Sequence, residues 1–171
     1  MADERLLRMV DVREITGLSR ACPTKPSASA LVDAGLLIGL EVCRQLAAGG
    51  VNVILTARDA IAGSKAAAKL VKKGLPVTLQ PLDVADPASI PAFADHIRGR
   101  SIVIDILVNN AGVSLKGFNT NAVRKTKAVN FFGAMHLTDT LMPSMTPDGR
   151  IVMVSSGLGK LSCLSPDRQE T

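Results

Sequence analysis

Short apolar runs alternate with longer helical stretches along most of the chain, and this alternation restricts the fold more than any other feature. The runs are mostly rich in Val and Ile and too short for ordinary helices, as buried parallel strands are. They occupy Ala30–Val32, Val51–Thr56, Val77–Leu82, Ile102–Val108 and Ile151–Val154. Strands and helices that alternate at this spacing form right-handed βαβ units. The sequence therefore predicts an α/β fold with a doubly wound parallel sheet.

Four helices are expected between the strands. They cover Leu36–Ala48, Ala60–Lys73, Pro87–Arg98 and a stretch from about Asn121 to Leu141. Asp59 is placed as the N-cap of the second helix and Gly74 as its stop signal, while Asp86 is placed as the cap of the third. With about five strands and these flanking helices, the chain is predicted to form an incomplete Rossmann-like sheet.

Length and composition limit the classes of function. The 171 residues suffice for one α/β domain with a sizeable core but not for two. The net charge of +5 comes from scattered basic residues, of which Lys65, Lys69, Lys72 and Lys73 are typical of a solvated helix face. No apolar run has membrane-spanning length, and the three cysteines lack ligand or disulfide spacing. We therefore expect no nucleic-acid or membrane partner and a cytoplasmic location.

Arg58 follows the second predicted strand, at the sheet edge where folds of this class bind ligands. In dinucleotide-binding proteins this position reads the adenosine ribose. An acidic residue there suits the 2′-hydroxyl of NAD, whereas a guanidinium suits the 2′-phosphate of NADP through charge-assisted hydrogen bonds. Arg58 thus favours NADP, although a solvated arginine with no ligand is the alternative.

The segment after the fourth strand is more specific. Asn109-Asn110-Ala111-Gly112 offers two amides for backbone or ligand and two small residues that allow close approach. Asn130 lies inside the fourth predicted helix, where asparagine is disfavoured, so it has either a specific role or an exposed surface position. Ser156 follows the fifth strand at the same edge.

In combination, these segments resemble the short-chain dehydrogenase/reductase family. The family order is followed by Arg58-Asp59, Leu82-Asp83-Val84, Asn109 to Gly112, Asn130 to Gly133 and Gly149 to Ser156. Ile38 to Leu46 and Ser162 to Pro166 are similar to the monomeric carbonyl reductases of that family. The resemblance implies NADPH-dependent reduction of a small-molecule carbonyl to an alcohol. It also divides the chain into an extension or linker unlike the family (1–29), a Rossmann-like NADP-binding domain (30–160) and the disordered start of a truncated insertion (161–171).

The resemblance implies a role for each matched residue. Arg58 would hold the 2′-phosphate, and Asp83 with Val84 would flank the adenine. Asn130 would support its helix and a proton-relay water, and Ser156 would hydrogen-bond the substrate carbonyl. The remaining cofactor-binding residues would be Ile38 and Gly39 in the first helix, and Asn109, Asn110, Ala111 and Gly112 along the ribose and nicotinamide.

The phosphate-binding loop departs from the family pattern Thr-Gly-x-x-x-Gly-x-Gly. Asp33 stands at the first glycine and Leu37 at the second, and only Gly39 matches. A carboxylate ~4 Å from a phosphate charge costs roughly 4 kcal/mol at an effective dielectric of about 20. A helix N-terminus returns only ~1 kcal/mol. We therefore predict that NADP(H) binding is weakened by about two to three orders of magnitude.

The family's catalytic tyrosine, followed four residues later by a lysine, has no counterpart, because the chain contains no tyrosine. We expect the chain alone to be inactive. Two alternatives remain open. The first is a non-catalytic interaction module that recruits a protein partner through an open sheet edge at Ile151–Val154. The second is a splice or gene-model fragment.

Overall fold

The structure is a computed structural model that describes residues 28–33, 37–115, 117 and 119–155. In this part of the chain, five parallel strands form one sheet in the order β3-β2-β1-β4-β5. The strands are β1 (Ser29–Asp33), β2 (Asn52–Ala57), β3 (Val77–Pro81), β4 (Ile104–Asn109) and β5 (Met145–Met153). The helices are α3 (Leu37–Ala48), α4 (Ala60–Val71), α5 (Ser89–Gly99), α6 (Thr120–Lys127), η1 (Ala128–Gly133), α7 (Ala134–Leu141) and η2 (Met142–Ser144). The predicted Rossmann-like fold is confirmed.

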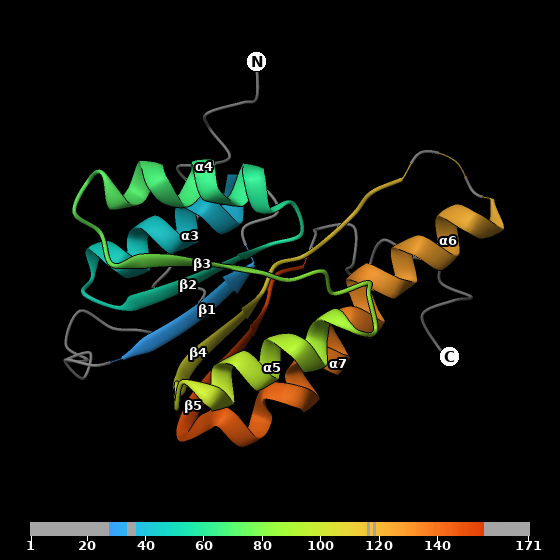
Figure 1. Cartoon of the computed structure of the whole chain (residues 1–171). Coiled ribbons are helices and arrows are strands. Elements are labelled where there is room, and N and C mark those ends of the chain that lie inside the picture. The colour runs from blue at the N-terminus through green and yellow to red at the C-terminus, as the bar shows by residue number, and fades with distance from the viewer. Residues whose placement is uncertain (1–27, 34–36, 116, 118, 156–171) are drawn as a thin grey trace, which may run out of the picture.

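Two apolar cores lie on opposite faces of the sheet. Helices α3 and α4 cover one face, and α5 and α7 cover the other (Figure 1). Successive strand residues point to opposite faces, so Val32 belongs to the core under α3 whereas its neighbour Leu31 belongs to the core under α5 and α7. Both side chains are fully buried. This burial on both faces explains why the central strand is uniformly apolar in sequence.

The chain around α4 follows its sequence signals closely. The Asp59 carboxylate accepts hydrogen bonds from the backbone N–H groups of Ile61 (2.9 Å) and Ala62 (3.0 Å), so the predicted N-cap is confirmed. Gly74 has φ +74°, the left-handed conformation expected of a stop signal. The helix itself ends slightly earlier than predicted, at Val71.

The sequence predicts that the third helix begins at Pro87, which is two residues before its observed start at Ser89. The Asp86 carboxylate accepts from the backbone N–H of Ala88 at 3.0 Å and thereby forms a turn that includes Pro87. Helix α5 then starts at Ser89 without a side-chain cap. Aspartate commonly bonds to the backbone two residues later in such turns, and this local bond competes with helix initiation.

The fourth predicted helix is not uniform. Its middle, η1, is a π-helix between α6 and α7, which widens the turn around Asn130. Strand β5 also begins earlier than predicted, because Met145 pairs with Ile104 before an irregularity in register and pairing then resumes at Arg150 opposite Ile106. Both features depend on neighbouring elements, so local sequence patterns did not predict them.

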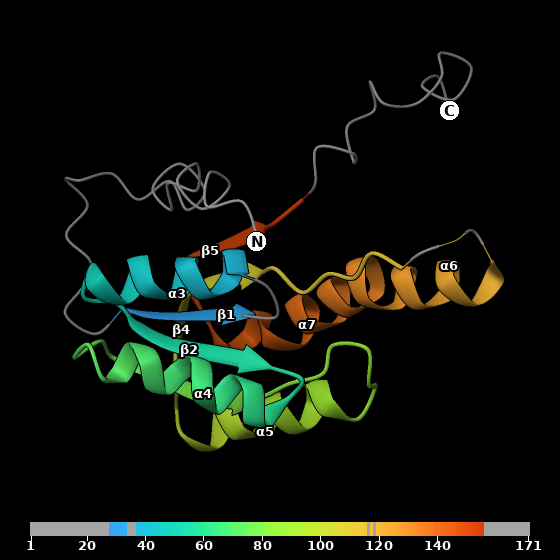
Figure 2. The same ribbon diagram turned by 90° about the horizontal axis from the view of Figure 1, so that it is seen from above.

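The ends of the strands locate the functional edge. Helix α6 lies beyond the carboxyl ends of β1 and β2 (Figure 2). Strand β1 begins one residue before the expected domain boundary, at Ser29.

The expectations for the segments 1–27 and 156–171, including that for Ser156, concern residues outside the described part. None of the helices among the described residues has the length and apolar character needed to cross a bilayer.

Candidate cofactor-binding site

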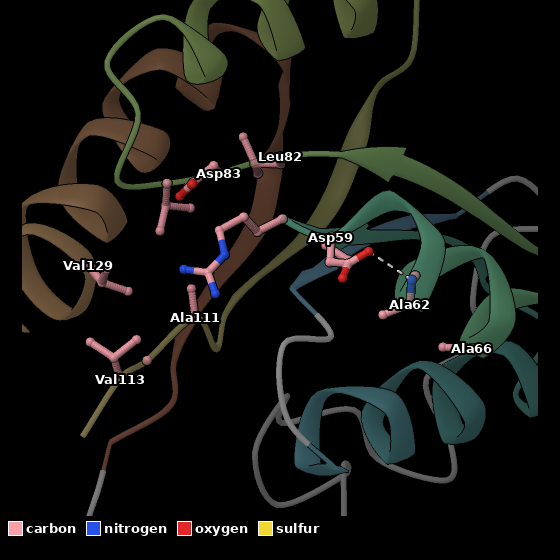
Figure 3. A pocket seen from close by; sticks show the side chains of 13 residues that line it. Asp59, Ala62, Ala66, Leu82, Asp83, Ala111, Val113 and Val129 are labelled. Atoms are coloured by element: carbon pink, nitrogen blue, oxygen red, sulfur yellow. Dashed lines mark hydrogen bonds between the residues drawn. The ribbon is translucent and has the colours of Figure 1, made fainter. Parts of the chain in front are cut away.

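A cavity of about 240 Å³ opens at the carboxyl ends of β2, β3 and β4. In Figure 3, Asp59, Ala62 and Ala66 approach it from one side, while Val113 and Val129 lie across from them. The full lining consists of Ala57, Arg58, Asp59, Ala62, Gly63, Ala66, Leu82, Asp83, Val84, Ala111, Gly112, Val113 and Val129. Most of these side chains are small or apolar, so the cavity suits a flat apolar group better than a strongly hydrated one.

Arg58 is the cation of this cavity. It is the first residue after β2 and is exposed, while Ala57 before it is buried in the sheet. The carboxylate of the next residue, Asp59, caps the N-terminus of α4. The hydrogen bonds from the N–H groups of Ala62 and Ile61 lower the pKa of its carboxyl below the ordinary value. A fixed carboxylate on the helix therefore stands beside a long cationic side chain that lines the cavity.

Helix α4 can form a wall of the cavity because its cavity-facing residues are small. A Cβ atom on Gly63 would lie 2.7 Å from Leu79 Cδ1 and 2.9 Å from Ala57 Cβ. Glycine is normally unfavourable inside a helix by about 1 kcal/mol relative to alanine. At this position it allows α4 to pack directly on β2 and β3.

Asp83 and Val84 form the wall that follows β3. The backbone N–H of Asp83 donates to Ser89 Oγ at 2.9 Å, and the Asp83 carboxylate accepts from the backbone N–H of Ala85 at 2.9 Å. Val84 is buried, whereas Asp83 is only partly so. Hydrogen bonds thus hold both the backbone and the side chain of Asp83. Its carboxylate lies beside the apolar surface of Val84.

Ala111, Gly112 and Val113 form the opposite wall, and Asn130 fixes it. The backbone N–H of Val113 donates to Asn130 Oδ1 at 2.8 Å, and Asn130 Nδ2 donates to the carbonyl oxygen of Val113 at 3.0 Å. The amide of Asn130 thus satisfies both backbone groups of one loop residue. The disfavoured asparagine in the helix therefore has a specific structural partner, although its residue is exposed.

The same residues match a known family. The family model described as short chain dehydrogenase matches residues 32–165. The chain belongs to this family. Human (Homo sapiens) carbonyl reductase (NADPH) 3 is 38% identical over 135 residues, which cover 76% of this chain and 46% of the relative. The chain spans about half the length of the curated relatives it matches.

Solved structures of this dehydrogenase family agree with the fold. Menthone neomenthol reductase from Mentha piperita superposes with a TM-score of 0.72 at 30% identity, covering 79% of this chain and 62% of that one. A gluconate 5-dehydrogenase from Burkholderia cenocepacia, solved in complex with NADP and tartrate, gives a TM-score of 0.62 at 27% identity. Here the shared region covers 68% of this chain and 48% of the other.

Five of the predicted site residues line the cavity: Arg58, Asp83, Val84, Ala111 and Gly112. Asn109 does not. Its buried amide donates to Thr138 Oγ1 (3.0 Å) and Met153 Sδ (3.2 Å), so it joins β4 to α7 and β5. Asn110 is buried next to it. The strand-end motif of this dehydrogenase family thus divides between the sheet interior and the cavity.

The remaining predicted residues lie at the start of α3. Ile38 is half-buried and packs against the core under α3, and Gly39 is buried in the same turn. Neither is among the cavity lining. The backbone of Asp33 ends β1, in register with Thr56, and Leu37 begins α3. Both thus lie at the edge of the sheet where the cavity opens.

Sequence reasoning missed the lining residues of α4 and of η1. Ala62, Gly63 and Ala66 come from α4, and Val129 from η1. The accumulation of small residues in Ala60–Val71 was a usable signal, since small side chains on one helix face allow close packing. No comparable signal marked Val129, because its place depends on how η1 packs.

Proposed function

We propose that this chain binds NADP(H), with the adenosine end of the cofactor in the cavity. The observation that carries the proposal is the position of Arg58, the cation directly after β2 in a cavity that is otherwise lined mostly by small and apolar residues, with the carboxylates of Asp59 and Asp83. A guanidinium pairs well with a phosphate through parallel hydrogen bonds. The relatives named carbonyl reductase (NADPH) and the dehydrogenase solved with NADP support the choice of NADP over NAD.

In this proposal Arg58 holds the 2′-phosphate, and the adenine lies between Asp83 and Val84. Ala111 and Gly112 border the ribose, because their small side chains leave room for it. Asn109 and Asn110 keep this strand end in place from inside the sheet. The start of α3, with Ile38 and Gly39, receives the pyrophosphate end, since helix N-termini favour anions.

Binding is weakened in the native sequence. Asp33 stands at the end of β1 and Leu37 at the first residue of α3, where the family pattern has glycines. The negative charge of an aspartate opposes a pyrophosphate, and a leucine obstructs its approach to the backbone. We expect an affinity about two to three orders of magnitude below that of a member with intact glycines. Micromolar or tighter binding of NADPH would contradict this part.

The reaction of the lineage is reduction of a small-molecule carbonyl to an alcohol. Bound NADPH supplies the hydride. By the resemblance, Ser156, which lies outside the described residues, would hydrogen-bond the carbonyl oxygen. Asn130 keeps Val113 in position and would support the proton-relay water. The chain contains no tyrosine to donate a proton, so we propose that these 171 residues alone do not reduce carbonyls. Measurable NADPH-dependent carbonyl reduction by the purified 171-residue protein would contradict this part of the proposal.

Titration with NADPH and NADH tests cofactor binding. The wild-type chain is expected to prefer NADPH. Arg58→Ala should remove this preference by weakening NADPH binding about 10–100-fold, the usual contribution of a hydrogen bond to a charged group. Lys69→Ala is the matched control, because Lys69 is an exposed cation of α4 that does not line the cavity. Equal binding of both cofactors by the wild-type chain would overturn the proposal.

A second candidate is a non-catalytic protein that binds a partner along β5. This strand is the edge of the described sheet, and its Ile151 and Met153 are 40% and 56% exposed. Apolar edge strands pair readily with other chains. Co-purification tests this candidate: a stoichiometric protein should accompany the wild type and be lost from Ile151→Lys, and a wild type that purifies without a partner would count against the edge. We propose a cytoplasmic location, because the three cysteines of the sequence lack ligand or disulfide spacing, as is usual for proteins of a reducing compartment.

A further inference from the structure

The π-helical segment η1 contacts both walls of the cavity, although it contributes only one lining residue. That residue is Val129. Asn130, the next in sequence, holds Val113 of one wall by two hydrogen bonds. Gly133 lies against Val84 of the other wall. The six residues of η1 therefore determine the positions of three lining residues, Val129, Val113 and Val84.

The contact between Gly133 and Val84 leaves no space for a side chain. A Cβ atom on Gly133 would lie 2.7 Å from the carbonyl oxygen of Val84, 2.9 Å from its Cβ and 3.0 Å from its Cγ2. Two of these three atoms belong to the backbone or are fixed to it, so rotation of the Val84 side chain cannot relieve the contact. Gly133 and Val84 are both buried.

We propose that Gly133 is a positioning residue of the cofactor cavity: its missing side chain sets the distance between η1 and Val84. A methyl group at this position has to move either Val84 or η1. Moving Val84 displaces the wall after β3. Moving η1 displaces Val129 and, through Asn130, also Val113. Either shift changes the width of the cavity. The positioning role follows from the packing, and only the choice of NADP(H) as the ligand rests on the proposed function.

Gly133→Ala tests the proposal, with Gly149→Ala as its matched control. Gly149 has a similar closest contact, since a Cβ there would lie 2.8 Å from the carbonyl oxygen of Thr146, but it is in β5 and does not line the cavity. Both variants should lower the melting temperature. Only Gly133→Ala should weaken the binding of NADPH and of adenosine 2′,5′-bisphosphate, by about tenfold or more. Wild-type affinity in folded Gly133→Ala would overturn the inference and leave NADP binding intact.

Hydrogen exchange gives a readout that needs no ligand. The amide of Val113 is bonded to Asn130, and the amides of Asp83 and Ala85 are bonded in the wall that contains Val84. Exchange in at least one of these two walls should therefore quicken in Gly133→Ala and not in Gly149→Ala. If the wild-type chain binds no nucleotide, the proposed function fails while faster exchange still supports the positioning role. Unchanged exchange in that case overturns the role as well.

A double variant covers the case in which Gly133→Ala does not fold. Adding Val84→Gly removes the Cβ and Cγ2 atoms that crowd the new methyl group. The carbonyl oxygen of residue 84 remains, but a glycine backbone can turn it aside because glycine has the widest range of φ and ψ. The double variant should fold and bind NADPH as Val84→Gly alone does, because the two substitutions are coupled. A double variant that stays unfolded although Val84→Gly alone folds would show that Val84 is not what Gly133 accommodates, and would overturn the positioning role.

Discussion

The side-chain amide of Asn130 makes two hydrogen bonds to the backbone of Val113, accepting from its N–H at 2.8 Å and donating to its carbonyl at 3.0 Å. These residues lie in the π-helix and in the loop after β4, so the pair connects two elements that are 17 residues apart in sequence. Such a pair satisfies backbone groups that the loop itself leaves without a partner.

Asn130→Ala should lower the free energy of unfolding by about 1 kcal/mol, because the loss of two hydrogen bonds, although they are exposed, exceeds the gain in helix propensity. Chemical denaturation measures this. Asn121→Ala, at an exposed position of α6, makes the same chemical change and should be neutral or slightly stabilising. Equal effects of the two substitutions would show that the bonds to Val113 contribute nothing.

The fold could be predicted from the sequence because the strands are buried on both faces and hence uniformly apolar. The caps depended on local bonds: Asp59 was predicted correctly, but Asp86 forms a turn before α5 instead of capping it. The π-helix was not predictable, since it depends on Val113 and Val84, which are distant in sequence. In the same way, the strand ends of the site were predicted whereas Val129 was missed.

Gly63→Ala should destabilise the protein by about 1–3 kcal/mol through overpacking, since its methyl group would press on Leu79 and Ala57. Thermal unfolding measures the change. Gly99→Ala is the control, because a Cβ at the end of α5 meets nothing within 4 Å. That substitution should be neutral or stabilise by up to about 1 kcal/mol through the unfolded chain. A Gly63→Ala variant as stable as Gly99→Ala would refute the close packing of α4 on the sheet.

The cap of α4 should make stability depend on acid pH. Hydrogen bonds from Ala62 and Ile61 lower the pKa of Asp59 in the folded state. This contribution is therefore present above the unfolded-state pKa of about 3.9 and is lost as the pH falls through the lower folded value. Asp59→Asn keeps a capping oxygen but does not titrate. As the pH falls from neutral through the unfolded-state pKa and then the lower folded value, the melting temperature of the wild type should drop relative to that of Asp59→Asn. A difference independent of pH would disprove the charged cap.

Asp33 and Leu37 should limit cofactor affinity for different reasons. Asp33 is the last residue of β1, so Asp33→Asn removes a negative charge at the sheet edge without changing the side-chain size. We expect NADPH to bind more tightly by up to about a thousandfold in low salt, with the gain shrinking as salt screens the charge. Asp95→Asn is the control, because it changes the net charge equally on α5, where Asp95 pairs with Arg98. Leu37→Gly should add a gain that salt does not reduce, since it removes bulk and not charge. If Asp33→Asn binds NADPH no better than Asp95→Asn, electrostatic repulsion at the end of β1 is not what weakens binding.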